Sequence, residues 1–130
     1  AVTGVQTCAL PIYYQRSGMD FFASDKNPFS VSWHVLCQFA AWCGCDTIHA
    51  GMYGGYLSDT EEFLRTTMQI LQAGNVVPAL SCGLTAAHVQ PIVEKFGVDW
   101  MANAGGAIHG HPGGTRAGVA AIRNAIESLT

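Results

Sequence analysis

The chain has 130 residues, 49% of them hydrophobic and 12% charged, with a formal net charge of −3 at pH 7. This length allows one domain or part of one. The acidic balance offers no basic face for nucleic acid, and no window holds the roughly eighteen unbroken apolar residues of a membrane span. The five cysteines lack the spacing of a disulfide framework, so we expect reduced thiols and a cytoplasmic protein with neither a nucleic-acid nor a membrane partner.

Residues 1–12 differ in origin, we expect, from the rest of the chain. The string from Val2 to Ile12 resembles a translation of the adapter used in short-read DNA library preparation. It is too short for a signal peptide and has no basic segment at its start. We therefore treat residues 1–12 as foreign and residues 13–130 as a natural sequence that is truncated on its N-terminal side.

The first long element predicted along the chain is a helix at residues 31–42, which follows an unclassified segment at 13–20 and a turn. Apolar residues recur in this helix at three- and four-residue spacing, as expected for a helix with one buried side. The predicted buried face consists of Val31, Leu36, Phe39, Ala40 and Cys43.

Three strand–loop–helix units follow this helix. The strands are predicted at 45–49, 76–81 and 98–102, and each leads through a short glycine-bearing loop into a helix. In the last helix, predicted at 115–129, the inward-facing residues are Val119, Ile122, Ala125 and Ile126.

Alternating strands and helices favour a parallel sheet. Ligands bind at the carboxyl ends of such strands, where all three loops would lie. The sequence therefore predicts an α/β fold, either part of a (β/α)8 barrel or part of an open doubly wound sheet. The absence of a Gly-x-Gly-x-x-Gly motif makes a dinucleotide-binding sheet the weaker alternative.

The loop at 103–118 contains Gly105 and Gly106, which lack the Cβ that would keep an oxyanion away from their backbone amides. Two glycines alone indicate a plain turn more often than an anion site. His49 lies at the end of the first predicted strand. Without a known relative, a hydrogen-bonded core histidine with a structural role is the favoured interpretation of this residue. His109 and His111 suggest a metal pair, but two histidines at this spacing need further ligands, and none is arranged nearby in the sequence.

Three motifs, at 48–51, 78–83 and 103–118, resemble the RuBisCO large-chain superfamily, which includes carboxylases and RuBisCO-like proteins. The resemblance covers residues 15–130. It implies that the chain is the last three βα-units, with a preceding helix, of a (β/α)8 TIM barrel. It also implies that the intact protein is a homodimer.

The resemblance implies where substrate phosphates bind. The segment 81–83 and the glycine pair at 105–106 take the positions that hold one phosphate of a sugar bisphosphate, with Cys82 in place of a glycine. His49 and Arg16 take the positions that contact the second phosphate. The implied phosphate-binding residues are Arg16, His49, Ser81, Gly83, Gly105 and Gly106.

Tyr56 stands where carboxylases of this superfamily carry a lysine in the sixth loop. A neutral phenol cannot replace an ammonium that stabilises a developing carboxylate. The resemblance thus favours a RuBisCO-like enzyme, a lyase or isomerase that enolises a phosphorylated ketose with Mg²⁺, whose ligands lie upstream of this chain. The alternatives are a divergent ribulose-bisphosphate carboxylase and a non-catalytic sugar-phosphate-binding barrel. We expect no turnover from this chain alone.

Overall fold

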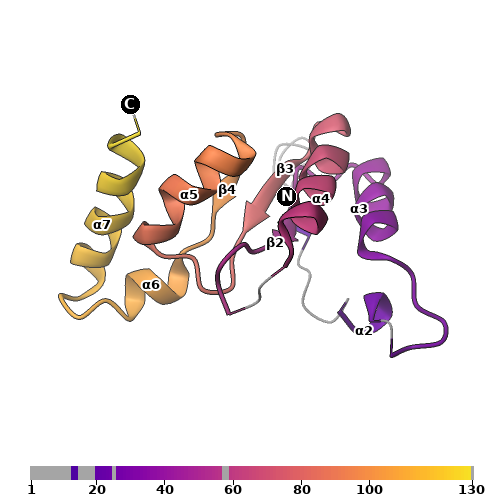
Figure 1. Cartoon of the computed structure of the whole chain (residues 1–130), viewed down its shortest axis with the longest axis horizontal. Coiled ribbons are helices and arrows are strands. Elements are labelled where there is room, and N and C mark those ends of the chain that lie inside the picture. Colours follow the sequence, from indigo (N-terminus) through magenta and orange to yellow (C-terminus); the bar gives the residue numbers. More distant parts are fainter. Residues whose placement is uncertain (1–12, 15–19, 25, 57–58, 130) are drawn as a thin grey trace, which may run out of the picture.

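The structure is a computed structural model that describes residues 13–14, 20–24, 26–56 and 59–129 (Figure 1). Its four strands form one parallel sheet and lie side by side in chain order. The predicted α/β fold with a parallel sheet is therefore confirmed. The strands are β1 (Tyr13–Tyr14), β2 (Thr47–Gly51), β3 (Val77–Leu80) and β4 (Met101–Ala102).

Helices connect these strands, and four of them, α3, α4, α5 and α7, stand side by side along the molecule in chain order (Figure 1). Both α2 and α3 lie between β1 and β2, whereas α6 and α7 follow β4. The helices are α2 (Asp20–Ala23), α3 (Trp33–Trp42), α4 (Glu61–Ala73), α5 (Ala86–Phe96), α6 (Gly105–His109) and α7 (Thr115–Glu127).

The core lies between the sheet and these helices. Most residues of β2 and β3 are buried, and Leu64 and Leu71 of α4 are fully buried with them. Trp33, at the start of α3, is buried as well, and its indole Nε1 donates a hydrogen bond to the carbonyl of Ala50 at 3.3 Å. This bond ties α3 to β2.

The buried face of α3 differs from the predicted one. Trp33, Cys37 and Ala40 are buried, whereas Phe39 is 51% exposed and Cys43 is exposed. The three buried residues follow i, i+4, i+7 spacing, so the large indole of Trp33 sets the rotation of the helix. Of the predicted buried residues, Leu36 is half-buried and Val31 is exposed.

The contact side of α7 also differs in part from the prediction. Ile122 is buried and Ala125 half-buried, but Val119 and Ile126 are 49% and 47% exposed. Gly118 is buried because α7 crosses the backbone of Ile108 there so closely that a Cβ would collide with it. A glycine adds nothing to a hydrophobic pattern, so this contact escapes the periodicity of the sequence.

Two strands and one loop also depart from prediction. The two residues of β1 fall in the segment that the sequence leaves unclassified. In place of a strand at 98–102, only Met101–Ala102 pairs with β3, and Val98 is exposed. The predicted glycine-rich loop after β4 contains a short helix, α6, which begins at Gly105.

Within the part of the chain that the structure describes, no helix combines the length and the apolar character that a bilayer crossing requires.

Candidate functional site

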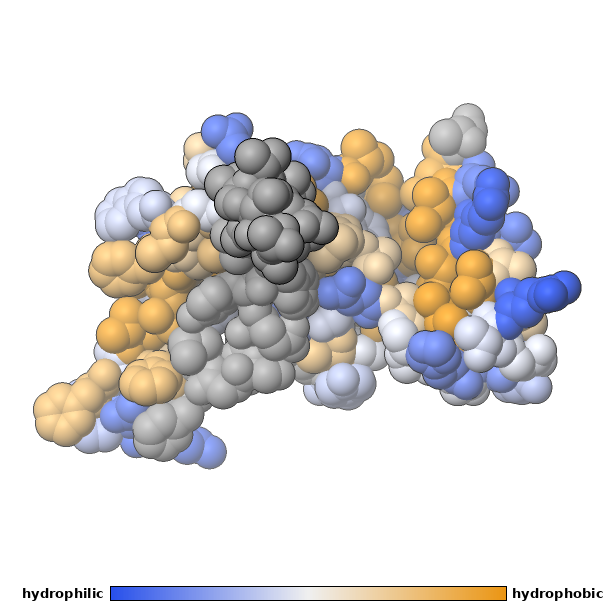
Figure 2. Space-filling view, turned by 180° about the vertical axis from the view of Figure 1, so that it is seen from behind, coloured by the Kyte–Doolittle hydropathy of each residue, from blue (hydrophilic) through white to orange (hydrophobic). Residues whose placement is uncertain are grey.

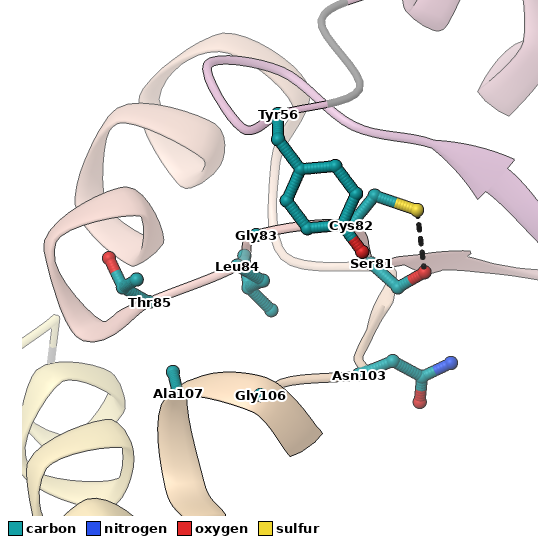
Figure 3. A pocket seen from close by; sticks show the side chains of 9 residues that line it. All are labelled: Tyr56, Ser81, Cys82, Gly83, Leu84, Thr85, Asn103, Gly106 and Ala107. Atoms are coloured by element: carbon teal, nitrogen blue, oxygen red, sulfur yellow. Dashed lines mark hydrogen bonds between the residues drawn. The ribbon is translucent and has the colours of Figure 1, made fainter. Parts of the chain in front are cut away.

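A cavity of about 490 Å³ opens at the carboxyl ends of β3 and β4 (Figure 3). Three segments line it: Tyr56 in the loop after β2, residues 81–85 after β3, and Asn103, Gly106 and Ala107 after β4. Ligands bind at this end of the strands in parallel α/β proteins. The cavity therefore lies where the sequence predicts a binding site.

The turn after β3 has an unusual backbone. Cys82 and Gly83 both have positive φ angles, 72° and 100°. A Cβ on Gly83 would come within 2.9 Å of the ring of Tyr56, so this position requires glycine for conformation and for space. Cys82 adopts the left-handed conformation without that freedom, at a cost of about 1–2 kcal/mol.

The loop after β2 packs directly on this turn. The amide of Tyr56 donates to the carbonyl of Cys82 at 3.1 Å, and a Cβ on Gly55 would collide with the same carbonyl. At its other end the loop is closed by Asp59, whose carboxylate accepts a hydrogen bond from the amide of Met52 at 3.0 Å. The position of Tyr56 over the cavity is therefore fixed through the backbone.

His88 connects the same loop to α5. Its Nδ1 accepts a hydrogen bond from the amide of Thr85 at 3.0 Å and lies 2.8 Å from the Thr85 hydroxyl. Its Nε2 lies 3.1 Å from the carbonyl of Gly54, to which it donates in the tautomer that these partners require. One imidazole thus joins the start of α5 to the loop that carries Tyr56.

His49 lies behind the cavity wall. His49 is buried in the core, with 3% of its surface exposed, and its Nε2 is 2.7 Å from the hydroxyl of Ser81. The Cys82 sulfur is 3.8 Å from the same nitrogen and 3.6 Å from the Ser81 hydroxyl. The imidazole therefore reaches the cavity through Ser81, which lines it.

Tyr56 is 84% exposed and presents its ring to the cavity (Figure 3). A hydrogen bond with Cys82 raises the pKa of the phenol above its ordinary value, and the charge of the Cys82 thiolate and partial desolvation act in the same direction. At neutral pH Tyr56 is thus an uncharged hydroxyl. The cavity has no ammonium at this position.

Gly105 and Gly106 begin α6. A Cβ added to either residue would meet nothing within 4 Å, so the space beside both glycines is open. Gly106 lines the cavity, whereas Gly105 is next to it in the chain and outside the lining. The amide of Asn103 donates to the carbonyl of Leu80 at 2.9 Å and so anchors this segment to β3.

The structure brings together most of the predicted phosphate-binding residues. Ser81, Gly83 and Gly106 line one cavity, and His49 contacts Ser81 from behind. Arg16 lies outside the described residues. Sequence reasoning missed His88, although a threonine followed three residues later by a hydrogen-bonding side chain at a helix start is a recognisable capping signal.

Among the residues that the structure describes, no group of three or more His, Cys, Asp or Glu side chains could hold a metal ion. His111 instead accepts a hydrogen bond from the amide of Gly113 at 3.0 Å, and His109 is exposed at the end of α6. These residues do not fit a Mg²⁺ site.

The sequence matches a known family along almost its whole length. A sequence model of the "Ribulose bisphosphate carboxylase large chain, catalytic domain" matches residues 3–130. The chain is 33% identical over 112 residues to the ribulose bisphosphate carboxylase of Pyrococcus furiosus, which covers 82% of this chain and 27% of that protein. It is 28% identical over 138 residues to the large chain of Porphyra purpurea, covering 91% of this chain and 28% of the relative.

Solved structures show the same similarity. The octameric carboxylase/oxygenase of Pyrococcus horikoshii superposes with a TM-score of 0.85 at 29% identity, covering 95% of this chain and 30% of that one. A RuBisCO-like protein, MtnW, of Alicyclobacillus acidocaldarius gives a TM-score of 0.78 at 29% identity, covering 92% of this chain and 31% of that one. The chain thus spans less than a third of the length of these relatives.

The foreign origin of residues 1–12 stays a prediction.

Proposed function

Since this chain belongs to the family of the RuBisCO large chain, catalytic domain, we propose that it supplies the phosphate-binding loops of a RuBisCO-like enzyme that acts on a phosphorylated ketose. The observation that carries this proposal is the cavity shared by Ser81, Gly83 and Gly106. Two successive loops meet there and offer a hydroxyl and backbone amides. Such groups bind phosphate oxygens without a charged side chain.

We assign one phosphate of the substrate to Ser81, Gly83, Gly105 and Gly106. The open space beside both glycines supports a close approach of phosphate oxygens to their amides. For the second phosphate we propose His49 together with Arg16, as the resemblance implies. The bond between His49 and Ser81 would then link the two phosphate-binding groups.

The proposed reaction is enolisation or isomerisation of the bound ketose. Such a reaction would need a Lewis acid, which Mg²⁺ would supply in this superfamily, and a base for the neighbouring proton. We propose that the ligands of that Mg²⁺ and the base lie outside this chain. The part played by this chain's residues is to hold the phosphates and thereby orient the carbon skeleton.

Tyr56 supports a RuBisCO-like enzyme over a carboxylase. It lines the cavity, and its raised phenol pKa keeps it neutral. By the resemblance, it takes the position where carboxylases carry a lysine. It can donate a hydrogen bond but cannot supply the positive charge that a developing carboxylate needs. The rival proposal is a divergent carboxylase, which the names of relatives such as the Pyrococcus furiosus carboxylase favour.

We further propose that the sheet is part of a (β/α)8 barrel. Within the described part of the chain, β1 pairs with β2 only and β4 with β3 only, so both outer strands have an open edge. Each edge is flanked by exposed apolar side chains, and Figure 2 shows hydrophobic surface toward both ends of the molecule. At the β4 edge an apolar hollow of about 280 Å³ is lined by residues that include Val89, Trp100 and Ile126. Further βα-units would cover these surfaces.

A homodimer is the proposed assembly of the intact protein. The related archaeal enzyme of Hyperthermus butylicus is dimeric, with a TM-score of 0.76 and 26% identity to this chain. The Pyrococcus horikoshii relative is octameric. The subunits of both oligomers are about three times as long as this chain. We therefore propose the dimer for the full-length protein.

Substituting Gly106→Ala in the full-length protein tests the phosphate assignment. The new Cβ meets nothing within 4 Å, so the fold should tolerate it, and it projects into space that the phosphate would use. We expect calorimetric binding of ribulose bisphosphate to weaken about tenfold or more, because the Cβ keeps a phosphate oxygen away from the amide of Gly106, while the unfolding temperature should not fall. Unchanged affinity in a folded Gly106→Ala variant would refute the assignment.

A further inference from the structure

Cys82 is a feature of the cavity that the proposed phosphate binding does not use. It replaces a glycine of the resembled motif, and its φ of 72° holds the side chain in a conformation that residues with a Cβ rarely adopt. The thiol is directed toward the hydroxyl of Ser81, 3.6 Å away (Figure 3). It also lies 3.8 Å from Nε2 of His49. Thiol, hydroxyl and imidazole form one connected group at the cavity.

We propose that Cys82 is a modification site, a thiol that peroxides oxidise to a sulfenic acid with Ser81 and His49 taking up its proton. The 2.7 Å bond between the Ser81 hydroxyl and His49 Nε2 provides the path. The thiol gives its proton to the serine oxygen while the serine gives its own to the imidazole. The thiolate that remains is the nucleophilic form of cysteine.

The oxidation needs hydrogen peroxide alone as co-reactant. The thiolate sulfur attacks one peroxide oxygen, a sulfur–oxygen bond forms, and the oxygen–oxygen bond breaks. The leaving hydroxide takes back the proton from His49 through Ser81 and departs as water. The sulfur is oxidised and the peroxide reduced, and Cys82 ends as a sulfenic acid.

The other described cysteines lack this arrangement and serve as internal references. Cys37 is fully buried, which keeps peroxide out. Burial raises the pKa of the Cys45 thiol, and the neighbouring Cys43 and Asp46 raise it further, so the Cys45 thiolate is disfavoured. Cys43 is exposed at the end of α3 and is the reference for an accessible thiol outside the cavity.

Oxidation has a consequence that rests on the proposed function. The oxygen added to the sulfur occupies space beside the Ser81 hydroxyl, where a phosphate oxygen would bind. Modified protein should therefore bind phosphate more weakly. In a Cys82→Gly variant, phosphate affinity should no longer respond to peroxide.

The test is site-resolved trapping of sulfenic acid in the full-length protein. Limiting hydrogen peroxide is added with dimedone, and mass spectrometry of peptides measures the labelling rate at each cysteine. We expect Cys82 to be labelled about tenfold faster than Cys43, because the Ser81 hydroxyl and the His49 imidazole lie beside its sulfur to take up the proton. His49→Gln and Ser81→Ala should bring Cys82 down to the Cys43 rate, and the buried Cys37, which should stay unlabelled, is the control for folding.

Equal labelling of Cys82 and Cys43 in the wild-type protein would overturn the proposal, whatever the variants do. Repeating the labelling in the presence of inorganic phosphate tests the thiol site and the phosphate assignment separately. If phosphate slows the labelling of Cys82 but not of Cys43, the result supports both the thiol site and the phosphate assignment. Fast labelling of Cys82 without protection supports the thiol site and removes the phosphate assignment.

Discussion

At the scale of single residues, the turn after β3 combines a conformational cost with a chemical group. Cys82 adopts a left-handed conformation in which glycine is at ease, while its sulfur contacts Ser81 and His49. Strain of this kind persists where the surrounding structure determines it, and here the Tyr56 amide binds the carbonyl of the strained residue. The loop after β2 therefore helps to hold the cysteine in place.

Replacing Cys82 with glycine should raise the free energy of unfolding by about 1 kcal/mol, because the left-handed conformation loses its steric cost. Denaturant unfolding measures the change. Cys82→Ala retains a Cβ and should give no gain. Asn75→Gly is a matched control away from the cavity: Asn75 also has a positive φ, 57°, but asparagine tolerates it, so the gain there should be smaller. A destabilised Cys82→Gly variant would show that the thiol contacts outweigh the strain.

At the scale of elements, the site depends on contacts between loops that are far apart in the chain. His88 at the start of α5 binds Gly54 in the loop after β2, across 34 positions. Lys95 at the end of the same helix forms an ion pair of 2.6 Å with Glu61 at the start of α4. Both ends of α5 are thus tied to the unit before it.

His88→Ala should lower the free energy of unfolding by about 1–2 kcal/mol, since it removes hydrogen bonds at two ends of one imidazole. Faster amide exchange at residues 54–56 should accompany the loss. His88→Asn separates the two contacts, because its shorter side chain can still cap α5 but cannot reach Gly54. If the amides of residues 54–56 exchange as slowly in His88→Asn as in the wild type, the hydrogen bond from His88 to Gly54 has no role in ordering the loop.

The Glu61 ion pairs predict a pH dependence of stability. Hydrogen bonding to Lys95, and then to Arg65, lowers the pKa of the Glu61 carboxyl. A lowered pKa means that the stabilisation is complete above the ordinary pKa of glutamate and is lost as the pH falls through the lowered value. Glu61→Gln should therefore lower the unfolding temperature at neutral pH but make no difference in strong acid.

The matched control for this prediction is Glu127→Gln. Glu127 pairs with Arg123 within α7, where both side chains are largely exposed, so the pair joins no two elements. Its removal should change the unfolding temperature less than Glu61→Gln does. Equal effects at neutral pH would mean that the contact between α4 and α5 adds nothing beyond a surface pair.

At the scale of the whole molecule, the sequence predicts the α/β order well and the cross-loop contacts poorly. The apolar runs predict β2, β3 and β4 in the observed order, although β4 keeps only two of its five predicted residues. The loops that follow bring Ser81, Gly83 and Gly106 to one end of the sheet, as predicted. The two residues of β1 are too few to form a pattern. The bond from His88 to Gly54 depends on how two loops meet, which periodicity within one element cannot reveal.

Besides the local packing of Trp33 and Gly118, the mispredicted faces of α3 and α7 share a further physical cause. Exposed apolar residues such as Phe39 on α3 and Ile126 on α7 belong to the outermost helices of the row (Figure 1). Periodicity counts apolar residues but does not say which of several neighbours will cover them. In the proposed barrel, these faces would contact further βα-units, and the predicted burial would then hold for the full-length protein.

The decisive experiment is fixation of labelled CO2 by the full-length protein, supplied with ribulose bisphosphate and Mg²⁺. By the resemblance, Tyr56 stands where a carboxylase needs a lysine ammonium, and its phenol is neutral. We predict that ribulose bisphosphate binds, that the binding weakens in Gly106→Ala, and that no label enters product above the enzyme-free control. Robust, protein-dependent fixation of CO2 would contradict this prediction and establish the chain as part of a divergent carboxylase.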